Sequence, residues 1–219
     1  ETGRDAEEAI AAPDLPPVAG VIMSAMVLQD QDFLNLQMEK ARKVLAPKVQ
    51  ATLLLSEILS NSEDAFLDFC VFFSSVTSVL GNQRQAAYGA ANSWMDTLAH
   101  AANKRFLQYH RHNKRAGREE EESRPVLGRV LSCNWGPISG AGVLTRGANS
   151  RNVAYLKSIG FDLVPAIECV HTLEALLPCS AVAQTMVGHY DWERIQKSFP
   201  QMRGVLEELL AETQREDAE

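Results

Sequence analysis

Short apolar runs of strand length alternate along the chain with longer segments of helical periodicity, and this alternation constrains the fold more than any other feature. The predicted strands lie at 18–24, 67–73, 126–135 and 184–190. The main predicted helices lie at 32–60, 88–107 and 165–177. Because parallel strands need a long crossover, usually a helix, we expect an α/β fold whose parallel sheet is covered by helices on both faces. Such a short set of strands also predicts that half of the sheet is missing from this chain.

The composition is that of an ordinary globular protein. Hydrophobic residues make up 46% and charged residues 22% of the 219 residues, which is enough for one sizeable core, and we predict a single domain over 1–219. The 28 acidic residues outnumber the 21 basic ones, so the net charge is −7. That balance argues against a nucleic-acid-binding surface. No apolar run approaches the roughly 20 residues that a membrane span needs.

Three segments stand apart from the strand and helix pattern. Residues 104–125 are basic and then acidic, which predicts a charged, flexible insertion; binding of an acidic partner by its basic half is the alternative. Residues 138–160 contain glycines before a helical pattern and are expected to form a lid loop and helix. Residues 192–219 are expected to form an amphipathic helical tail.

The four cysteines lack the close pairs typical of metal sites. Cys70, Cys133, Cys169 and Cys179 each lie in or beside an apolar stretch. This pattern predicts free, buried thiols in a reducing, cytoplasmic compartment. A disulfide or metal pair from Cys169 and Cys179 is the alternative.

Four polar residues occupy positions that the pattern assigns to the interior or to a strand end. Lys48 interrupts the apolar stripe of a helix, and Ser75 follows a buried strand. Tyr88 and Asn92 are four residues apart and so share one helix face. Together they could reduce a carbonyl: the serine holds its oxygen, the tyrosine donates a proton, and an adjacent ammonium lowers the tyrosine pKa. Each residue singly has an ordinary structural explanation, as a strand-end cap, a half-buried aromatic, a surface amide or a snorkelling lysine.

Five short motifs keep one order along the chain. They are Ala25–Asp30, Leu45–Val49, Phe73–Val76, Ala86–Asn92 and Asn134–Pro137. In this order and spacing they resemble the ketoreductase domain of modular polyketide synthases and animal-type fatty acid synthases. That family is a branch of the short-chain dehydrogenase/reductases, in which the lysine comes from the preceding helix and an asparagine follows the tyrosine. The resemblance implies a Rossmann-like, doubly wound sheet.

The resemblance also implies roles for individual residues. Tyr88 would donate the proton, and Ser75 would bind the carbonyl. Lys48 and Asn92 would together tune the pKa of the tyrosine and relay protons to it. The residues that would contact NADPH are Ala25, Met26, Trp135, Gly136 and Pro137. The implied reaction reduces a 3-oxoacyl thioester, carried on the phosphopantetheine arm of an acyl carrier protein, to the 3-hydroxyacyl thioester. The implied partners are this carrier protein, neighbouring synthase domains and the N-terminal half of the ketoreductase.

Two features depart from the family pattern. The glycine-rich loop that holds the cofactor phosphates lies in the family's first strand–helix unit, which this chain lacks. Gly140 and Gly142 follow a strand, but Thr145 stands where a third glycine is needed. We therefore expect the chain to be the C-terminal part of a ketoreductase and inactive by itself. Met26 replaces the glycine of many bacterial relatives, as in animal and fungal synthases. The alternative is a non-catalytic, reductase-like assembly module; no GxSxG or HExxH motif favours a hydrolase or a metalloenzyme.

The motifs also imply a product configuration. In the resembling synthases an aspartate after the first of these strands marks D-producing reductases, and Asp30 matches it. A tryptophan marks the L-producing type at the position where this chain has Leu80. The match is incomplete, since Gln29, Gln83 and Ala87 depart from residues that often accompany the aspartate. The resemblance therefore implies a D-hydroxy product.

Overall fold

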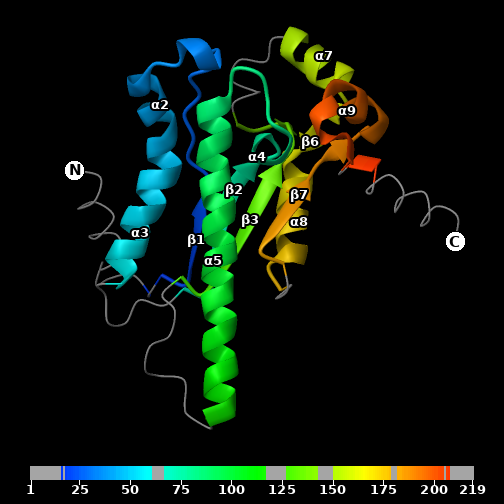
Figure 1. Ribbon diagram of the computed structural model, residues 1–219. Coiled ribbons are helices and arrows are strands. Elements are labelled where there is room, and N and C mark those ends of the chain that lie inside the picture. The colour runs from blue at the N-terminus through cyan, green and yellow to red at the C-terminus, as the bar shows by residue number, and fades with distance from the viewer. Residues whose placement is uncertain are drawn as a thin grey trace, which may run out of the picture. The chain divides into compact units, whose positions relative to one another are not determined.

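The computed structural model describes most of the chain (Figure 1). The described residues are 16, 18–60, 67–116, 127–142, 150–178, 182–204 and 206–207. They divide into two compact units, the first Glu1–Asn134 with Leu176–Thr185 and the second Trp135–Ala175 with Met186–Glu219. The single domain predicted from the sequence stays a prediction. Parts of the predicted insertion (117–125), lid (143–149) and tail (208–219) lie outside the described residues.

A four-stranded sheet forms the centre of the fold. Its strands are β1 (Gly20–Met23), β2 (Phe69–Ser75), β3 (Arg129–Trp135) and β7 (Gln184–Val187), in the order β1-β2-β3-β7. Strands β1 and β2 are parallel, with Gly20 opposite Phe69. A Cβ atom at Gly20 would lie 2.3 Å from the Phe69 ring, so a side chain there would force this ring to move. Each strand neighbours the next one of the sheet in chain order, as the predicted α/β fold requires.

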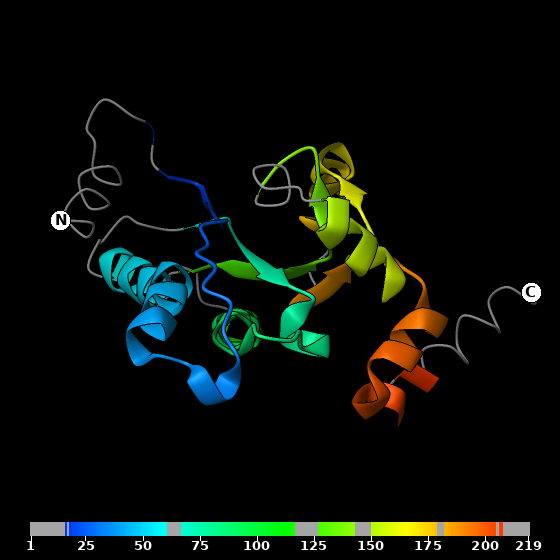
Figure 2. The same cartoon turned by 90° about the horizontal axis from the view of Figure 1, so that it is seen from above.

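Helices of the first unit pack on one face of this sheet (Figure 2). They are α2 (Met38–Leu45), a π-helical turn η2 (Ala46–Gln50), α3 (Ala51–Ser60), α4 (Thr77–Leu80) and α5 (Ala86–Ala116). The sequence predicts that Pro47 bends or divides the helix at 32–60. The structure confirms a division there: α2 and α3 are separated by η2, whose π-helical turn contains Pro47, a residue that cannot donate a backbone hydrogen bond. A short 3₁₀ turn, η1 (Phe33–Asn35), precedes α2.

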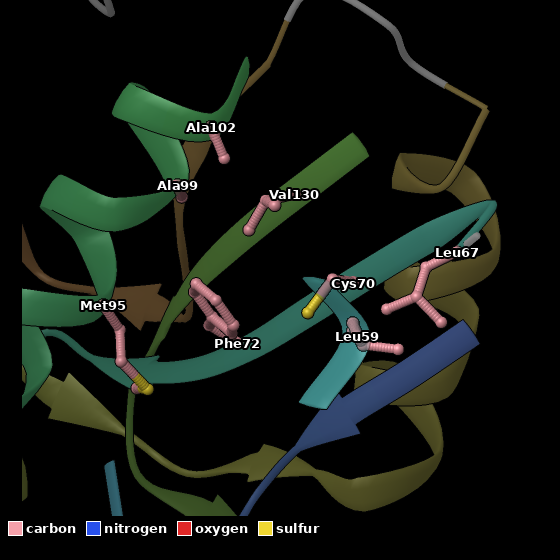
Figure 3. Close-up of a cluster of buried hydrophobic side chains, with 8 residues drawn as sticks. All are labelled: Leu59, Leu67, Cys70, Phe72, Met95, Ala99, Ala102 and Val130. Atoms are coloured by element: carbon pink, nitrogen blue, oxygen red, sulfur yellow. The ribbon is translucent and has the colours of Figure 1, made fainter. Parts of the chain in front are cut away.

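The hydrophobic core of the first unit lies between the sheet and its helices (Figure 3). Strands β2 and β3 contribute Cys70, Phe72 and Val130, and α5 contributes Met95, Ala99 and Ala102. Leu59 of α3 and Leu67, which precedes β2, complete the cluster. The small residues Ala99 and Ala102 let α5 approach the sheet closely. This packing positions the start of α5 beside the C-terminal ends of the strands.

Two predicted elements have different bounds in the structure. Helix α5 continues to Ala116, so residues 104–116 of the predicted flexible insertion are helical. Lysine, arginine, glutamine and leucine are good helix formers, and a charged helix can extend into solvent without burying surface. The predicted strand at 184–190 is divided into β7 and β8 (His189–Tyr190), which belong to different sheets. Gly188 separates them, and a Cβ atom there would lie 2.4 Å from the Tyr190 ring.

The second unit consists of short strands and helices. Its strand pairs are β4 (Ile138–Ser139) with β6 (Val164–Pro165), parallel, and β5 (Phe161–Asp162) with β8, antiparallel. Its helices are α7 (Ser150–Ser158), α8 (Ala166–Leu176), α9 (Trp192–Ser198) and the 3₁₀ turn η3 (Pro200–Met202). The Phe161 ring packs edge-on against Tyr190 and Phe199, with centroids 5.8 and 6.1 Å apart. Within the described residues, no helix is long and apolar enough to cross a membrane.

Candidate active site

Tyr88 lies near the start of α5, with its hydroxyl beside the side chains of Ser75 and Asn92. Burial raises the pKa of the Tyr88 hydroxyl, hydrogen bonds from Asn92 and Ser75 lower it, and the charge of Asp30 raises it. The hydroxyl also lies 4.0 Å from the sulfur of Met26. From the sequence we expect an adjacent ammonium to lower the pKa of Tyr88. The direction is opposite, because desolvation of the phenolate is the largest effect.

Ser75 is the last residue of β2 and is 8% exposed. Its Oγ accepts a hydrogen bond of 3.2 Å from the backbone N–H of Thr77, the first residue of α4. Ser75 therefore has the structural role of a strand-end cap. Because this bond uses a lone pair of Oγ, the hydroxyl proton stays available to a second acceptor.

Lys48 lies in the π-helical turn η2, with 2% of its surface exposed. Its Nζ donates a hydrogen bond of 2.6 Å to the carbonyl oxygen of Phe73 and lies 5.8 Å from the centroid of the Tyr88 ring. Burial lowers the pKa of Lys48 to about 8, and the charge of Asp96 partly opposes that shift. The lysine does not snorkel to solvent but is held beneath the tyrosine.

Two side chains hold the π-helical turn in place. Thr52 Oγ1 donates to the carbonyl oxygen of Lys48 at 2.6 Å, with that of Val49 at 3.0 Å, and accepts from the indole Nε1 of Trp94 at 3.1 Å. Thr52 is 1% exposed, and Trp94 belongs to α5. The helix that carries Tyr88 is thereby tied to the backbone of Lys48.

Asn92 is fully buried on α5, one turn after Tyr88. Its Nδ2 donates to the backbone carbonyl oxygen of Tyr88 at 2.8 Å. Its Oδ1 is buried and has no hydrogen-bond partner among the residues that the structure describes. A buried acceptor without a donor is costly, so this oxygen is suited to receive a proton donor such as an ammonium or a water molecule.

Sequence reasoning missed a second group of polar residues beneath Ser75. The carboxylate of Asp96 accepts hydrogen bonds from Ser78, Ser132 and Asn134. The signal for Asp96 is present in the sequence, because an aspartate four residues after Asn92 continues the stripe of Tyr88 and Asn92 into an apolar part of the helix.

The residues predicted to contact a cofactor lie in both units. In the first unit Ala25 is exposed after β1, and Met26 faces Tyr88. In the second unit Trp135 is 4% exposed, the Gly136 N–H donates to Val187 O at 2.8 Å, and Pro137 O accepts from Val164 N at 2.8 Å.

The glycine at position 136 is closely packed but not required by contact. A Cβ atom there would lie 3.4 Å from Gly188 Cα, Val187 O and the Tyr190 hydroxyl, which is an ordinary van der Waals distance.

The two residues connected with product configuration differ in their surroundings. The Asp30 carboxylate is exposed, and both of its oxygens lie 3.2 Å from Gln85 Nε2. The backbone also connects these two loops, since Gln31 N donates to Arg84 O at 2.8 Å. Leu80 is 4% exposed and belongs to the core, so the position that marks the L-producing type faces protein and not solvent.

Comparison with known proteins identifies the class to which this arrangement belongs. The KR domain family model matches residues 3–110, so this part of the chain belongs to the KR domain family. The chain is 36% identical over 151 residues to the hybrid PKS-NRPS synthetase xenE of Xenoacremonium sinensis. This aligned region covers 69% of this chain and 3% of the relative. The chain is also 49% identical over 94 residues to a polyketide synthase-nonribosomal peptide synthetase of Aspergillus clavatus. That aligned region covers 43% of this chain and 2% of the relative. The chain thus spans a small share of these relatives.

Solved structures give the same result for the fold. PlmKR1, the ketoreductase from the first module of phoslactomycin biosynthesis in Streptomyces sp. HK803, matches with a TM-score of 0.68 and 25% identity over 90% of this chain and 40% of its own. The first ketoreductase of the tylosin PKS matches with a TM-score of 0.65 and 28% identity over 91% of this chain and 37% of its own. The Rossmann-like fold of short-chain dehydrogenase/reductase ketoreductases, present in part, is therefore confirmed.

Proposed function

We propose that this chain carries the catalytic half of a ketoreductase domain, which reduces a 3-oxoacyl thioester on an acyl carrier protein with NADPH. The observation that carries the proposal is the arrangement around the Tyr88 hydroxyl. Ser75 and Asn92 both act to lower the pKa of this hydroxyl, Met26 Sδ lies 4.0 Å from it, and Lys48 Nζ lies 5.8 Å from the centroid of the Tyr88 ring. Membership in the KR family and similarity to multidomain synthases support a place beside other synthase domains.

The residues of this chain divide the proton chemistry among them. Ser75 Oγ–H donates a hydrogen bond to the substrate carbonyl oxygen, and the Tyr88 hydroxyl transfers its proton to that oxygen as negative charge develops there. The raised pKa of Tyr88 keeps the phenol protonated, and an alkoxide is basic enough to take that proton. Lys48 stabilises the phenolate that forms. Asn92 Oδ1 accepts a hydrogen bond from the Lys48 ammonium or from a water molecule that returns a proton to the phenolate.

The described residues fit one end of a nicotinamide cofactor. The exposed Ala25 and the Met26 sulfur next to the Tyr88 hydroxyl suit the nicotinamide end, where the bound cofactor would supply the hydride. Within the described part of the chain, no glycine-rich turn leads from a strand into a helix to hold the pyrophosphate. Strand β1 is the outer strand of the described sheet. We propose that the N-terminal half of the ketoreductase adds its strands there and supplies the phosphate loop.

The Asp30 carboxylate supports the D configuration for the product. Its charge acts on Tyr88, and its hydrogen bonds to Gln85 connect the segment after β1 with the loop that opens α5. Chiral chromatography of the reduced product from the full synthase tests this, and a predominantly L-hydroxy product would overturn it.

Removal of the Tyr88 hydroxyl tests the reaction itself. In the complete synthase, Tyr88→Phe should lower the rate of ketoreduction by about 10²-fold or more, because the proton donor is lost. Tyr109→Phe, on the same helix, is the matched control and should keep full activity. Unchanged activity in Tyr88→Phe would favour a non-catalytic assembly module. The 219-residue chain alone should show weak or no NADPH binding by calorimetry.

A further inference from the structure

Helix α5 presents Tyr88, Asn92 and Asp96 at intervals of four residues, so all three lie on one face. The first two belong to the proposed reaction, but Asp96 does not. It is 6% exposed, in a position where a carboxylate is rarely found without strong compensation. The question is what a buried negative charge contributes beneath this site.

The Asp96 carboxylate connects three elements of the first unit. Oδ1 accepts from Ser132 Oγ at 2.6 Å, and Oδ2 accepts from Ser78 Oγ at 2.6 Å and from Asn134 Nδ2 at 2.8 Å. Ser78 lies on α4, while Ser132 and Asn134 lie on β3. Since a carboxylate only accepts, it also fixes the orientation of the Asn134 amide, with the nitrogen toward Asp96.

The same donors reach the backbone of Ser75. Ser78 Oγ lies 2.8 Å, and Asn134 Nδ2 3.3 Å, from the carbonyl oxygen of Ser75. The Ser78 hydroxyl has a single proton but faces two acceptors, Asp96 Oδ2 and Ser75 O. The charge on Asp96 therefore determines how strongly Ser78 binds the carbonyl of Ser75, and so influences the position of the strand end.

The charge of Asp96 also acts on Lys48. The groups next to Lys48 are the Phe73 carbonyl from β2 and the Tyr88 ring from α5. The charge of Asp96, also on α5, acts on the pKa of Lys48. Burial alone favours the neutral amine, and Asp96 opposes it by raising the pKa of Lys48. Asp96 is thus the negative charge that favours an ammonium at a position that is 2% exposed.

We propose that Asp96 is a positioning residue of the Tyr88 site, which anchors the strand end that carries Ser75 and supplies a buried negative charge to the site. The assignment rests on the proposed function only in that the Tyr88 cluster is taken as the reactive site. The anchoring and the charge are properties of this chain and can be measured without substrate.

Two variants separate the charge from the anchor. Asp96→Asn is isosteric, and its carbonyl oxygen can still face Ser78 and Asn134 while its amide donates to Ser132, whose hydroxyl can turn. It therefore removes the charge and keeps most of the network. Ser132→Ala removes one hydrogen bond and keeps the charge. Glu39→Gln, at an exposed carboxylate on α2, is the control for a general loss of negative charge.

The experiment follows Lys48 directly by NMR in the 219-residue chain labelled with ¹³Cε-lysine, with Lys48→Met to assign the resonance. Asp96→Asn should lower the midpoint of the Lys48 titration by about one unit, whereas Ser132→Ala and Glu39→Gln should leave it near the wild-type value. Ser132→Ala should lower the urea midpoint of unfolding. An unchanged Lys48 titration in folded Asp96→Asn overturns the proposed charge effect, and an unchanged urea midpoint in Ser132→Ala overturns the anchor.

A measurement on the wild-type chain applies if Asp96→Asn does not fold. The ¹³Cγ resonance of Asp96 should show an inflection at the pH where Lys48 titrates, because the carboxylate senses the loss of the positive charge. Absence of that inflection overturns the proposal.

A kinetic measurement in the complete synthase separates this proposal from the proposed function. Asp96→Asn should lower kcat by about tenfold without a matching change in KM and should move the alkaline limb of the pH profile to lower pH. A wild-type synthase without reductase activity would contradict the proposed function and leave the NMR result standing.

Discussion

The Nζ atom of Lys48 lies 2.6 Å from the carbonyl oxygen of Phe73, in the strand that ends at Ser75. This hydrogen bond joins the helix that carries the lysine to the strand that carries the serine. Its donor is almost fully buried, and burial lowers the pKa of Lys48 to about 8. A site that needs an ammonium is therefore assembled at a cost to stability.

That cost predicts an unusual pH dependence. Below pH 8 the lysine is charged in both the folded and the unfolded chain, and folding must bury the charge. Between about 8 and the ordinary value of 10.5 the folded state releases the Lys48 proton first, so the contribution of Lys48 to the free energy of unfolding rises with pH, by up to about 3 kcal/mol. Lys48→Met should remove this rise. Urea unfolding from pH 7 to 10.5 measures it, and a difference between the two chains that does not vary with pH would refute it.

Thr52 should stabilise the π-helical turn. Thr52→Val keeps the shape of the side chain but removes its bonds to the Lys48 carbonyl oxygen and to Trp94 Nε1. We expect a loss of about 1–2 kcal/mol in the free energy of unfolding, because the partner groups are left unsatisfied. Thr97→Val is the matched control: its hydroxyl makes the same kind of bond, to Ser93 O, on an exposed position of α5, and should change little.

Gly160 should be intolerant of any side chain. Its φ is +100°, and a Cβ atom would lie 2.7 Å from both Asp191 O and Ile195 Cγ1. Gly160→Ala should therefore destabilise the second unit by about 2–3 kcal/mol. Gly142→Ala shares the positive φ of +78° but meets no atom of the described residues within 4 Å, so it should cost only about 1 kcal/mol. Thermal unfolding followed by circular dichroism compares the two variants. Equal losses of stability would contradict the role given to the contacts of a Cβ atom at position 160.

Cys70 should be unreactive in the folded chain. It is fully buried in the core, and burial raises its pKa from 9.0 to about 12. The unfolded chain ionises first, so this thiol contributes stability that is lost as the pH rises from about 9 toward 12. Iodoacetamide at pH 8 should label Cys70 only in urea, as peptide mass spectrometry can show. Rapid labelling without denaturant would be inconsistent with the core packing.

Pattern reasoning predicted the layout of the strands well, but it failed where a single residue decides an element's course. The run at 184–190 has the apolar content of one strand, yet β7 ends at Val187 and Gly188 separates it from β8. The charged stretch after Lys104 predicts a flexible insertion, although helix propensity carries α5 to Ala116.

The sequence by itself determined the α/β class, the approximate positions of the main strands and the family, because apolar periodicity and short motifs are local properties of the chain. It also named Lys48, Ser75, Tyr88 and Asn92. Only the tertiary structure decided what these groups experience: the raised pKa of Tyr88, the burial of Lys48 and the unpartnered Asn92 oxygen. It alone brought Asp96 against residues 18, 36 and 38 positions away. Desolvation and long-range hydrogen bonds depend on which surfaces meet, and no local pattern of residues contains that information.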